Sequence, residues 1–415
     1  MLSLLLNLSM ILFCGLIFKL PYVGVMLYYW FSILNPQRLV WGGADIRWSL
    51  LVVVLLMVSL IFTKKSNFKI NWIAPVRIFM AFFLWTCLTT IFAKYSQSTD
   101  LYITFLKTFL MTMMVIGMTD SREKLNAIVW VVVLSAGVYV LREGGKTILS
   151  GGTHHTMGPL NTPYAGNNEV GRLFGMALPF ILFLAYHTKQ GLMRKSLFLL
   201  LFIDIIAIIG TNSRGAFMGL IAAAAILFLR SQRKFMFLII AGIAVMGVQE
   251  MQSDAGEKRS GDRYSTIESY DADKSFQGRM FAWNYAMHDV MEESAIMGLG
   301  FGAFRGAITH KGTWKDAHSI YFEALGEHGI IGFSLYLLLL LSTINASRRL
   351  EKLTKGNPSL YWERDLIVAI QVFIAFFMVG GITISHTYIE LYYLVIAMLA
   401  ILDRQISTKL AETHQ

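Results

Sequence analysis

Charged side chains are scarce in this sequence. Asp, Glu, Lys and Arg together make up 15% of its 415 residues, whereas 55% of the residues are hydrophobic. A soluble domain usually has about 25% charged residues, because its surface must stay in water. The shortage excludes an ordinary soluble protein, and the mean hydropathy of +0.56 indicates a chain that lies in a membrane.

Cysteine and proline are also rare, with two and seven residues respectively. Cys14 and Cys87 lie inside apolar stretches, so we interpret them as small buried hydrophobic residues and not as a disulfide. The N-terminus has no basic region before its first apolar run and no small-residue cleavage site. We therefore expect no cleaved signal peptide.

Thirteen apolar runs are candidate membrane helices when about 20 residues are taken as one crossing. The first two are short, are separated by Lys19 and Pro21, and could form one broken unit. We therefore predict an all-α integral membrane protein with about 12 transmembrane helices, in a range of 11 to 13. The runs lie near residues 3–18, 20–34, 48–63, 73–93, 101–119, 126–141, 169–187, 196–210, 215–230, 235–249, 320–346, 365–384 and 387–402.

The net charge of +10 comes mainly from short loops between these runs. Short loops rich in Lys and Arg stay in the cytoplasm, so the charge indicates topology and we expect no nucleic-acid partner. This rule predicts a cytoplasmic C-terminal tail and places 143–168, 211–214 and 250–319 on the opposite side. The basic residues concerned are Lys64, Lys65, Lys69, Lys189, Arg194, Lys195, Arg230, Arg233, Lys234, Arg348, Arg349, Lys352, Lys355 and Arg364.

One long polar segment, 250–319, divides the chain into three parts. It has eleven carboxylates and eight Lys or Arg residues, and it separates the N-terminal membrane helices (1–249, about ten apolar segments) from the C-terminal ones and their tail (320–415). A glycine-rich run, 298–302, predicts a tight turn inside it. An amphipathic helix is predicted just before that turn from the three- and four-residue spacing of Met280, Trp283, Met287, Val290 and Met291.

Two arginines and a histidine are candidate site residues at the outer edge. Arg214 stands in a very short loop between apolar runs, where it either reaches the lipid headgroups or binds an anion. Arg279 lies in the amphipathic helix, where it either pairs with a loop carboxylate or holds an anionic ligand. His318 lies where the polar segment enters an apolar helix, and we predict that it shares a helical face with Tyr321. It is either structural or a general base.

Other polar residues are weaker candidates. Asn167, Asn168 and Arg172 enter an apolar run from the outer side and could line a polar cavity, and His386 could support the site. The Asp271-Ala-Asp273 pair has a metal-ligand spacing but no flanking structure. We therefore predict no metal and no cofactor.

The order of these motifs resembles the O-antigen ligase/polymerase superfamily of bacterial envelopes. The resemblance is clearest over about 196–345. Members often have Asn after the motif histidine, where this chain has Ser319, and either residue can donate a hydrogen bond. The motifs are Thr211-Asn-Ser-Arg214-Gly, Arg279 followed by Trp283, Gly298-Leu-Gly-Phe-Gly302, and His318-Ser with Glu327-His-Gly329-Ile-Ile-Gly332.

The resemblance implies an O-antigen ligase, a glycosyltransferase of GT-C-like architecture that acts at the periplasmic face of the bacterial inner membrane. The donor would be a glycan on undecaprenyl diphosphate, and the acceptor a sugar hydroxyl of lipid A–core oligosaccharide. The expected reaction is metal-independent and inverts the anomeric centre. By motif position, Arg214 and Arg279 would bind the donor diphosphate and His318 would be the catalytic base.

Three other functions stay open at this stage. An O-antigen polymerase uses the same donor with a second lipid-linked glycan as acceptor, and a protein O-oligosaccharyltransferase uses a Ser or Thr hydroxyl. A transporter or flippase of lipid-linked glycans is the alternative that is not an enzyme. A transporter should have repeats and broken helices near the bilayer midplane. Here the ionisable groups gather at one outer edge, which favours an enzyme that works at the membrane surface.

Overall fold

The computed structural model describes residues 2–39, 47–62, 68–93, 97–230, 274–304, 307 and 316–413. Every regular element in these ranges is helical, and no strand occurs among them, so the all-helical prediction is confirmed. The main helices are α1 (Leu2–Lys19), α2 (Tyr22–Leu34), α3 (Pro36–Leu39), α4 (Trp48–Phe62), α5 (Ala74–Ile91), α6 (Gln97–Met118), α7 (Arg122–Tyr139), η1 (Val140–Gly144), α8 (Gly145–Leu149), α9 (Asn167–His187), α10 (Gly191–Gly210), α11 (Arg214–Arg230), α14 (Lys274–Met287), α15 (Asp289–Ser294), α17 (Ile320–Thr354), η3 (Pro358–Leu360), α18 (Tyr361–Gly380) and α19 (Glu390–Thr413).

Five of these helical segments are long and apolar enough to cross a membrane, and three further apolar helices are shorter. Helices suit this environment because they satisfy their own backbone hydrogen bonds where no water is present. Twelve of the thirteen predicted runs coincide with helices; the run 235–249 lies outside the described residues. The five segments are Ala74–Ile91, Leu101–Met118, Arg122–Leu149, Asn167–His187 and Ile320–Thr354, and the shorter ones are Leu6–Lys19, Tyr22–Leu34 and Trp48–Phe62.

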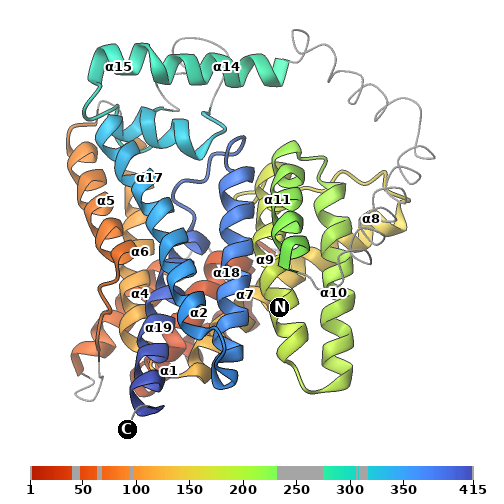
Figure 1. Cartoon of the computed structure of the whole chain (residues 1–415). Helices are drawn as coiled ribbons and strands as arrows, with labels where there is room; N and C mark the ends of the chain where they lie inside the picture. The colour runs from red at the N-terminus through yellow and green to blue at the C-terminus, as the bar shows by residue number, and fades with distance from the viewer. Residues whose placement is uncertain are drawn as a thin grey trace.

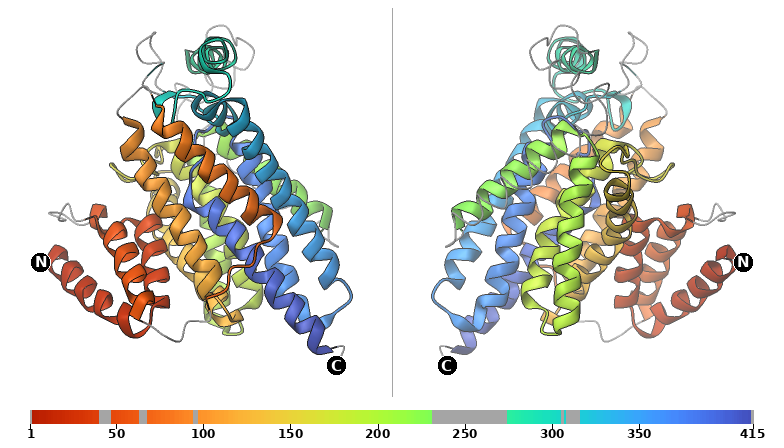
Figure 2. Two further views of the ribbon diagram at one scale, coloured as in Figure 1. Left: turned by 90° about the vertical axis from the view of Figure 1, so that its left-hand side faces the viewer. Right: turned by 90° about the vertical axis from the view of Figure 1, so that its right-hand side faces the viewer.

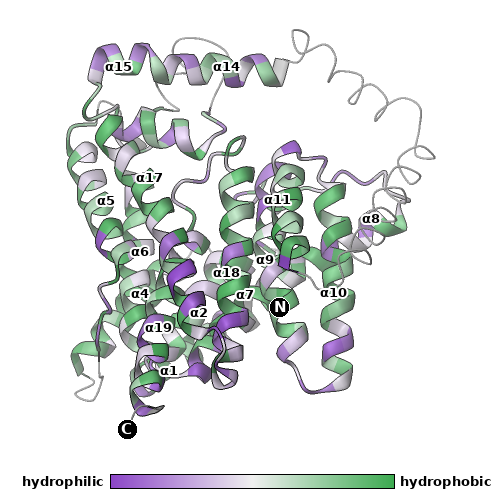
Figure 3. Ribbon diagram, in the orientation of Figure 1, coloured by the Kyte–Doolittle hydropathy of each residue, from purple (hydrophilic) through white to green (hydrophobic). Residues whose placement is uncertain are grey.

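The outer surface of the bundle is apolar. Leu12, Ile61 and Leu192 are 66%, 78% and 81% exposed, and many other large hydrophobic side chains are exposed with them. Such a surface is unfavourable in water and suits lipid chains. Figure 3 shows hydrophobic residues along the helices, and hydrophilic ones near the lower end of α10 and on α14 and α15. The chain is therefore a helical, multi-pass membrane protein.

The helices form one bundle, with α14 and α15 lying across one end of it. Figure 1 shows these two helices above the start of α17, at the end of the bundle opposite the C-terminus. The N-terminal helices α1, α2 and α4 stand to one side of the bundle in Figure 2. They are tied to it by hydrogen bonds from the Tyr22 hydroxyl to Lys124 O (2.6 Å) and from the Tyr139 hydroxyl to Leu34 O.

The centre of the bundle is built from α9, α18 and α19. In α9, 83% of the span is buried. Aromatic rings fill the space between these helices and their neighbours: Phe377 stacks on Tyr392 with ring centres 4.5 Å apart, and Phe79 stacks on Tyr393 at 4.4 Å. Large flat rings bury much apolar area and pack in preferred geometries, so these stacked pairs form the core between the central helices.

Helix α17 is kinked at Gly329, where φ is +63° and ψ is −167°. The glycine-rich run 298–302 packs at this kink. Its Gly300 N–H donates to Glu327 O (2.8 Å), and the Ile330 N–H donates to Ala295 O (2.8 Å). The predicted tight turn is confirmed, because Gly298, Gly300 and Gly302 all have positive φ, which side chains rarely allow.

The predicted amphipathic helix exists, and only part of its predicted face is buried: Val290 is in the core, and Trp283 and Met291 pack against it. It forms two helices, α14 and α15, separated at His288. Met280 and Met287, which were predicted to be on the apolar face, are 43% and 44% exposed. The small side chains at positions 282 and 286 allow the helix to approach its neighbours closely, so the buried face turns toward them. That face consists of Ala282, Tyr285, Ala286 and Val290.

Candidate functional site

Arg214 stands at the first position of α11, at the end of a turn fixed by hydrogen bonds. The Ser213 hydroxyl accepts from the Ala216 N–H (3.2 Å) and so caps the helix, while it also donates to Asn168 Oδ1 (2.7 Å). The Asn167 amide donates to Thr211 O (2.9 Å). Asn167 and Asn168 therefore hold this turn, and the Arg214 side chain at its end is exposed.

Arg279 and His318 lie on segments that touch through Trp283. The Trp283 indole N–H donates to Ala317 O (2.9 Å), and its ring stacks on Phe322 with centres 4.8 Å apart. Arg279 is one helical turn before Trp283, and His318 directly follows Ala317. The indole thus anchors α14 beside the chain that carries the histidine.

The prediction that His318 is part of a helix was wrong. Helix α17 begins at Ile320, and the Ser319 hydroxyl caps it by accepting from the Tyr321 N–H (3.3 Å). His318 precedes the cap and has φ of +44°, the left-handed region. Side chains rarely adopt this conformation, and residues that do so are frequent at functional sites. The histidine is half-buried.

The turn between α18 and α19 joins the segments of Arg214 and His318. The Ile320 N–H donates to Gly381 O (2.9 Å). On the other side, Gly215 lies so close to this turn that an added Cβ would come within 2.4 Å of Thr383 Oγ1. The starts of α11 and α17 are therefore joined through this turn, and α14 lies at the same end of the bundle (Figure 1).

A buried cation holds the same turn. Arg172 is fully buried, and its guanidinium donates to Phe377 O (3.4 Å) and Ile384 O (3.3 Å) and lies 4.4 Å from the centre of the Phe377 ring. The sequence suggested that Arg172 could line a cavity. Carbonyl oxygens and a ring face accept its charge instead, and this fixes both ends of the 377–384 segment.

His386 lies on the same turn, outside the helices, and its ring faces the Tyr164 ring at 6.5 Å. Burial, together with the smaller effect of the nearby Arg172 charge, lowers the pKa of His386 to about 3, against a hydrogen bond to the backbone of Pro163. The ring is therefore neutral near pH 7. This agrees with a supporting role and not with a charged ligand contact.

A buried polar chain beneath the site was not anticipated. The Tyr388 hydroxyl bonds the Glu327 carboxyl and His328 Nε2 (2.8 Å), and His328 Nδ1 bonds the Thr89 hydroxyl (2.7 Å). One turn earlier in α17, Glu323 accepts from the N–H (2.9 Å) and hydroxyl (2.6 Å) of Thr387. The adjacent Glu327 and His328 inside an apolar helix were the sequence feature that pointed to such a network.

Metal ligands do not cluster in the described part of the chain. No three His, Cys, Asp or Glu side chains there could hold a metal ion together. Asp271 and Asp273 lie outside the described residues. A metal-independent mechanism stays a prediction.

Two family models match the chain in succession. Residues 1–192 match a family of unknown function, and residues 197–337 match the O-antigen ligase family. The second match contains Arg214, Arg279 and His318 in the order that the motifs predict. Over residues 197–337 the chain belongs to the O-antigen ligase family. No curated protein matches it.

The match of residues 197–337 supports a membrane glycosyltransferase of the ligase and polymerase type. Substrates of this family are in general lipid-linked glycans and lipid acceptors. The resemblance seen in the sequence is thereby confirmed at the level of the family.

Proposed function

We propose that this member of the O-antigen ligase family is a ligase that moves a glycan from undecaprenyl diphosphate to a sugar hydroxyl of lipid A–core oligosaccharide. The family match supports the class of reaction. The observation that supports the site is that Trp283 bonds Ala317, Ile320 bonds Gly381, and Gly215 packs against Thr383. Through these contacts the segments of Arg214, Arg279 and His318 lie at one end of the bundle.

The proposed donor site uses the two arginines. Departure of the glycan leaves growing negative charge on the diphosphate, and fixed guanidinium groups stabilise that charge. Arg214 is exposed at a capped helix start, and Arg279 is on a helix anchored by Trp283, so both are supported by fixed backbone. A lipid diphosphate is already an activated leaving group, so no nucleotide is required.

The proposed base is His318. A neutral imidazole takes the proton from the acceptor hydroxyl as the oxygen attacks the anomeric carbon, while the bond to the diphosphate oxygen breaks on the opposite side. Attack opposite the leaving group inverts the anomeric centre. The Ser319 cap and the bond from Ile320 to Gly381 fix the backbone next to the histidine.

The topology that we propose follows the basic loops. It places the site end, with α14 and α15, in the periplasm of a bacterial inner membrane, and the C-terminus in the cytoplasm. About 12 spans in a GT-C-like arrangement and a periplasmic segment at 250–319 belong to this proposal. A cysteine placed at position 212 in the exposed turn should then react with a membrane-impermeant maleimide in intact spheroplasts.

The test is transfer by the purified full-length protein in proteoliposomes with undecaprenyl-diphosphate-linked glycan, lipid A–core and excess EDTA. We expect a glycosylated acceptor, and a loss of at least about 100-fold in rate for His318→Gln and for Arg279→Gln. Arg194→Gln, which changes an exposed arginine on α10 away from the site, is the matched control and should keep full activity.

Other outcomes would contradict the proposal. Donor glycans that grow on one another would show a polymerase, and absence of any product would remove the transferase assignment. Near-normal transfer by His318→Gln would remove the general base. Requirement for an added metal would remove the metal-independent mechanism.

A further inference from the structure

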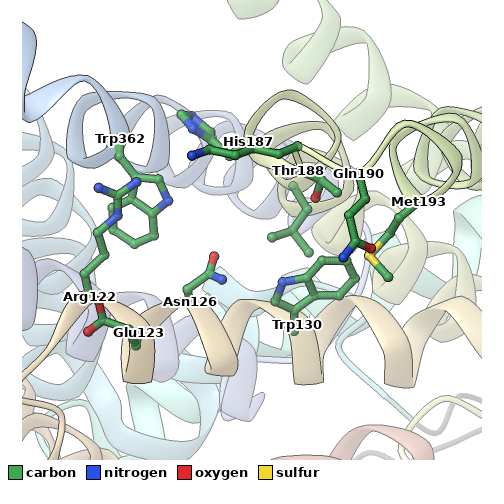
Figure 4. A pocket seen from close by; sticks show the side chains of 11 residues that line it. Arg122, Glu123, Asn126, Trp130, His187, Thr188, Gln190, Met193 and Trp362 are labelled. Atoms are coloured by element: carbon green, nitrogen blue, oxygen red, sulfur yellow. The ribbon is translucent and has the colours of Figure 1, made fainter.

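A polar pocket lies at the opposite end of the bundle from the proposed site. Its volume is about 500 Å³, and it is formed by the start of α7, the end of α9, the start of α10 and the start of α18. Figure 4 shows its side chains around a central opening. The lining residues used below are Arg122, Asn126, Trp130, Lys189, Gln190 and Trp362.

The lining combines cationic groups with indole rings. Arg122 is exposed, and its guanidinium lies 4.5 Å from the centre of the Trp362 ring, which helps to orient it. Lys189 adds a second positive charge, and Glu123 is the one carboxylate in the lining. The two acids of α18 near Trp362 are both paired: Asp365 with His187 (3.0 Å) and Glu363 with Lys409 (2.6 Å). The lining therefore has more positive than negative charge, and the planar guanidinium of Arg122 can bind two oxygens of a phosphate group at once.

The surface beside the pocket is suited to lipid chains. Asn126 and Trp130 line the pocket from α7, and the next positions on the same helical face are Leu134 and Val138. These two side chains are 60% and 43% exposed. One stripe of α7 therefore runs from the polar pocket to an exposed apolar surface. Indole rings at the boundary between the two are typical of the membrane interface.

We propose that this pocket binds the phosphate headgroup of an anionic phospholipid, with the lipid chains along Leu134 and Val138. The arginine supplies charge and two parallel donors, Lys189 supplies charge, and the amides of Asn126 and Gln190 can bond the headgroup hydroxyls. A free phosphate ion would share the charged contacts but not the apolar stripe. The site would be a structural lipid site in the leaflet opposite to the one where transfer is proposed.

The experiment is native mass spectrometry of the full-length protein with phosphatidylglycerol, with phosphatidylcholine, and with inorganic phosphate. We expect retention of phosphatidylglycerol, about 10-fold weaker in Arg122→Gln and partly restored in Arg122→Lys. Arg194→Gln is the matched control, because Arg194 is also near an aromatic ring (Phe198, 5.9 Å) but lies outside the pocket. The paired change Leu134→Ser and Val138→Ser should weaken binding of the lipid.

Three results would overturn the proposal. The first is equal retention of phosphatidylglycerol by Arg122→Gln and Arg194→Gln. The second is displacement of the lipid by millimolar inorganic phosphate with no effect of the paired serine variant, which would indicate a site for soluble anions. The third is equal retention of phosphatidylcholine, which would indicate general adhesion of lipid. Arg122 and Leu134 are exposed, so these variants should fold normally.

Discussion

Removal of one hydroxyl, that of Tyr388, should destabilise the protein because this group connects two buried residues. It bonds both the Glu327 carboxyl and His328 Nε2, and His328 is fully buried while Glu327 is 4% exposed. In Tyr388→Phe both partners stay buried and lose a hydrogen bond, and no water is available in the apolar bundle to replace it.

The magnitude follows from the number of bonds lost. A hydrogen bond contributes about 1 kcal/mol net, and bonds between membrane helices average about 0.6 and reach about 1.7 kcal/mol. Two bonds that leave buried polar groups behind should therefore lower the free energy of unfolding by about 2 kcal/mol.

A second tyrosine provides the control for the same chemical change. The Tyr336 hydroxyl is buried and bonds no atom of the residues that the structure describes. Tyr336→Phe removes a polar atom that has no such bond, so its free energy of unfolding should be unchanged or higher. Both variants keep the aromatic ring and its packing.

The assay is reversible unfolding of the purified protein in a titration with sodium dodecyl sulfate, followed by circular dichroism. Tyr388→Phe should unfold at a lower denaturant fraction than the wild type, and Tyr336→Phe should not. Equal midpoints for the two variants would refute the argument that the hydroxyl of Tyr388, and not its ring, stabilises this region.

Two further predictions concern the turns around the site. Ser319→Ala should lower the free energy of unfolding by about 1 kcal/mol in the same titration because the cap of α17 is lost, whereas Ser319→Asn should keep most of it; equal effects of both would exclude a capping role. The pKa of His386 is about 3 in the folded protein against 6.5 when unfolded, so the unfolded state binds a proton first and stability falls as the pH falls below 6.5. The loss from pH 7.5 to pH 5 should be about 2 kcal/mol. In His386→Gln this part of the pH dependence should disappear, and an unchanged slope would assign it to other groups.

Helix positions could be predicted because a membrane chain has few other choices. The backbone must satisfy its own hydrogen bonds, so an apolar run becomes a helix whatever its neighbours are. The break at Pro21 between α1 and α2 and the positive φ at Gly300 also follow from local chemistry, since proline lacks an N–H and glycine lacks a side chain.

Side-chain partners could not be predicted in the same way. Spacing showed that α14 has an apolar face, but Met280 and Met287 turned out exposed because the alanines at 282 and 286 permit a closer approach. Spacing also placed His318 on a helix. Helix α17 instead begins after His318, at Ile320, and the hydroxyl of Ser319 caps its N-terminus. Both errors arise from contacts between segments distant in the sequence or from a single cap.

Composition, charge distribution and motif order were sufficient to predict a helical membrane protein and the family that residues 197–337 match. These features depend on the surrounding solvent and on the residues themselves. Only the tertiary structure showed which contacts link the segments of Arg214, Arg279 and His318 at one end of the bundle. That arrangement depends on Trp283, on the Gly381 carbonyl and on buried Arg172, which act across more than 30 residues of sequence. Such contacts form only when the bundle is packed, and no local pattern specifies them.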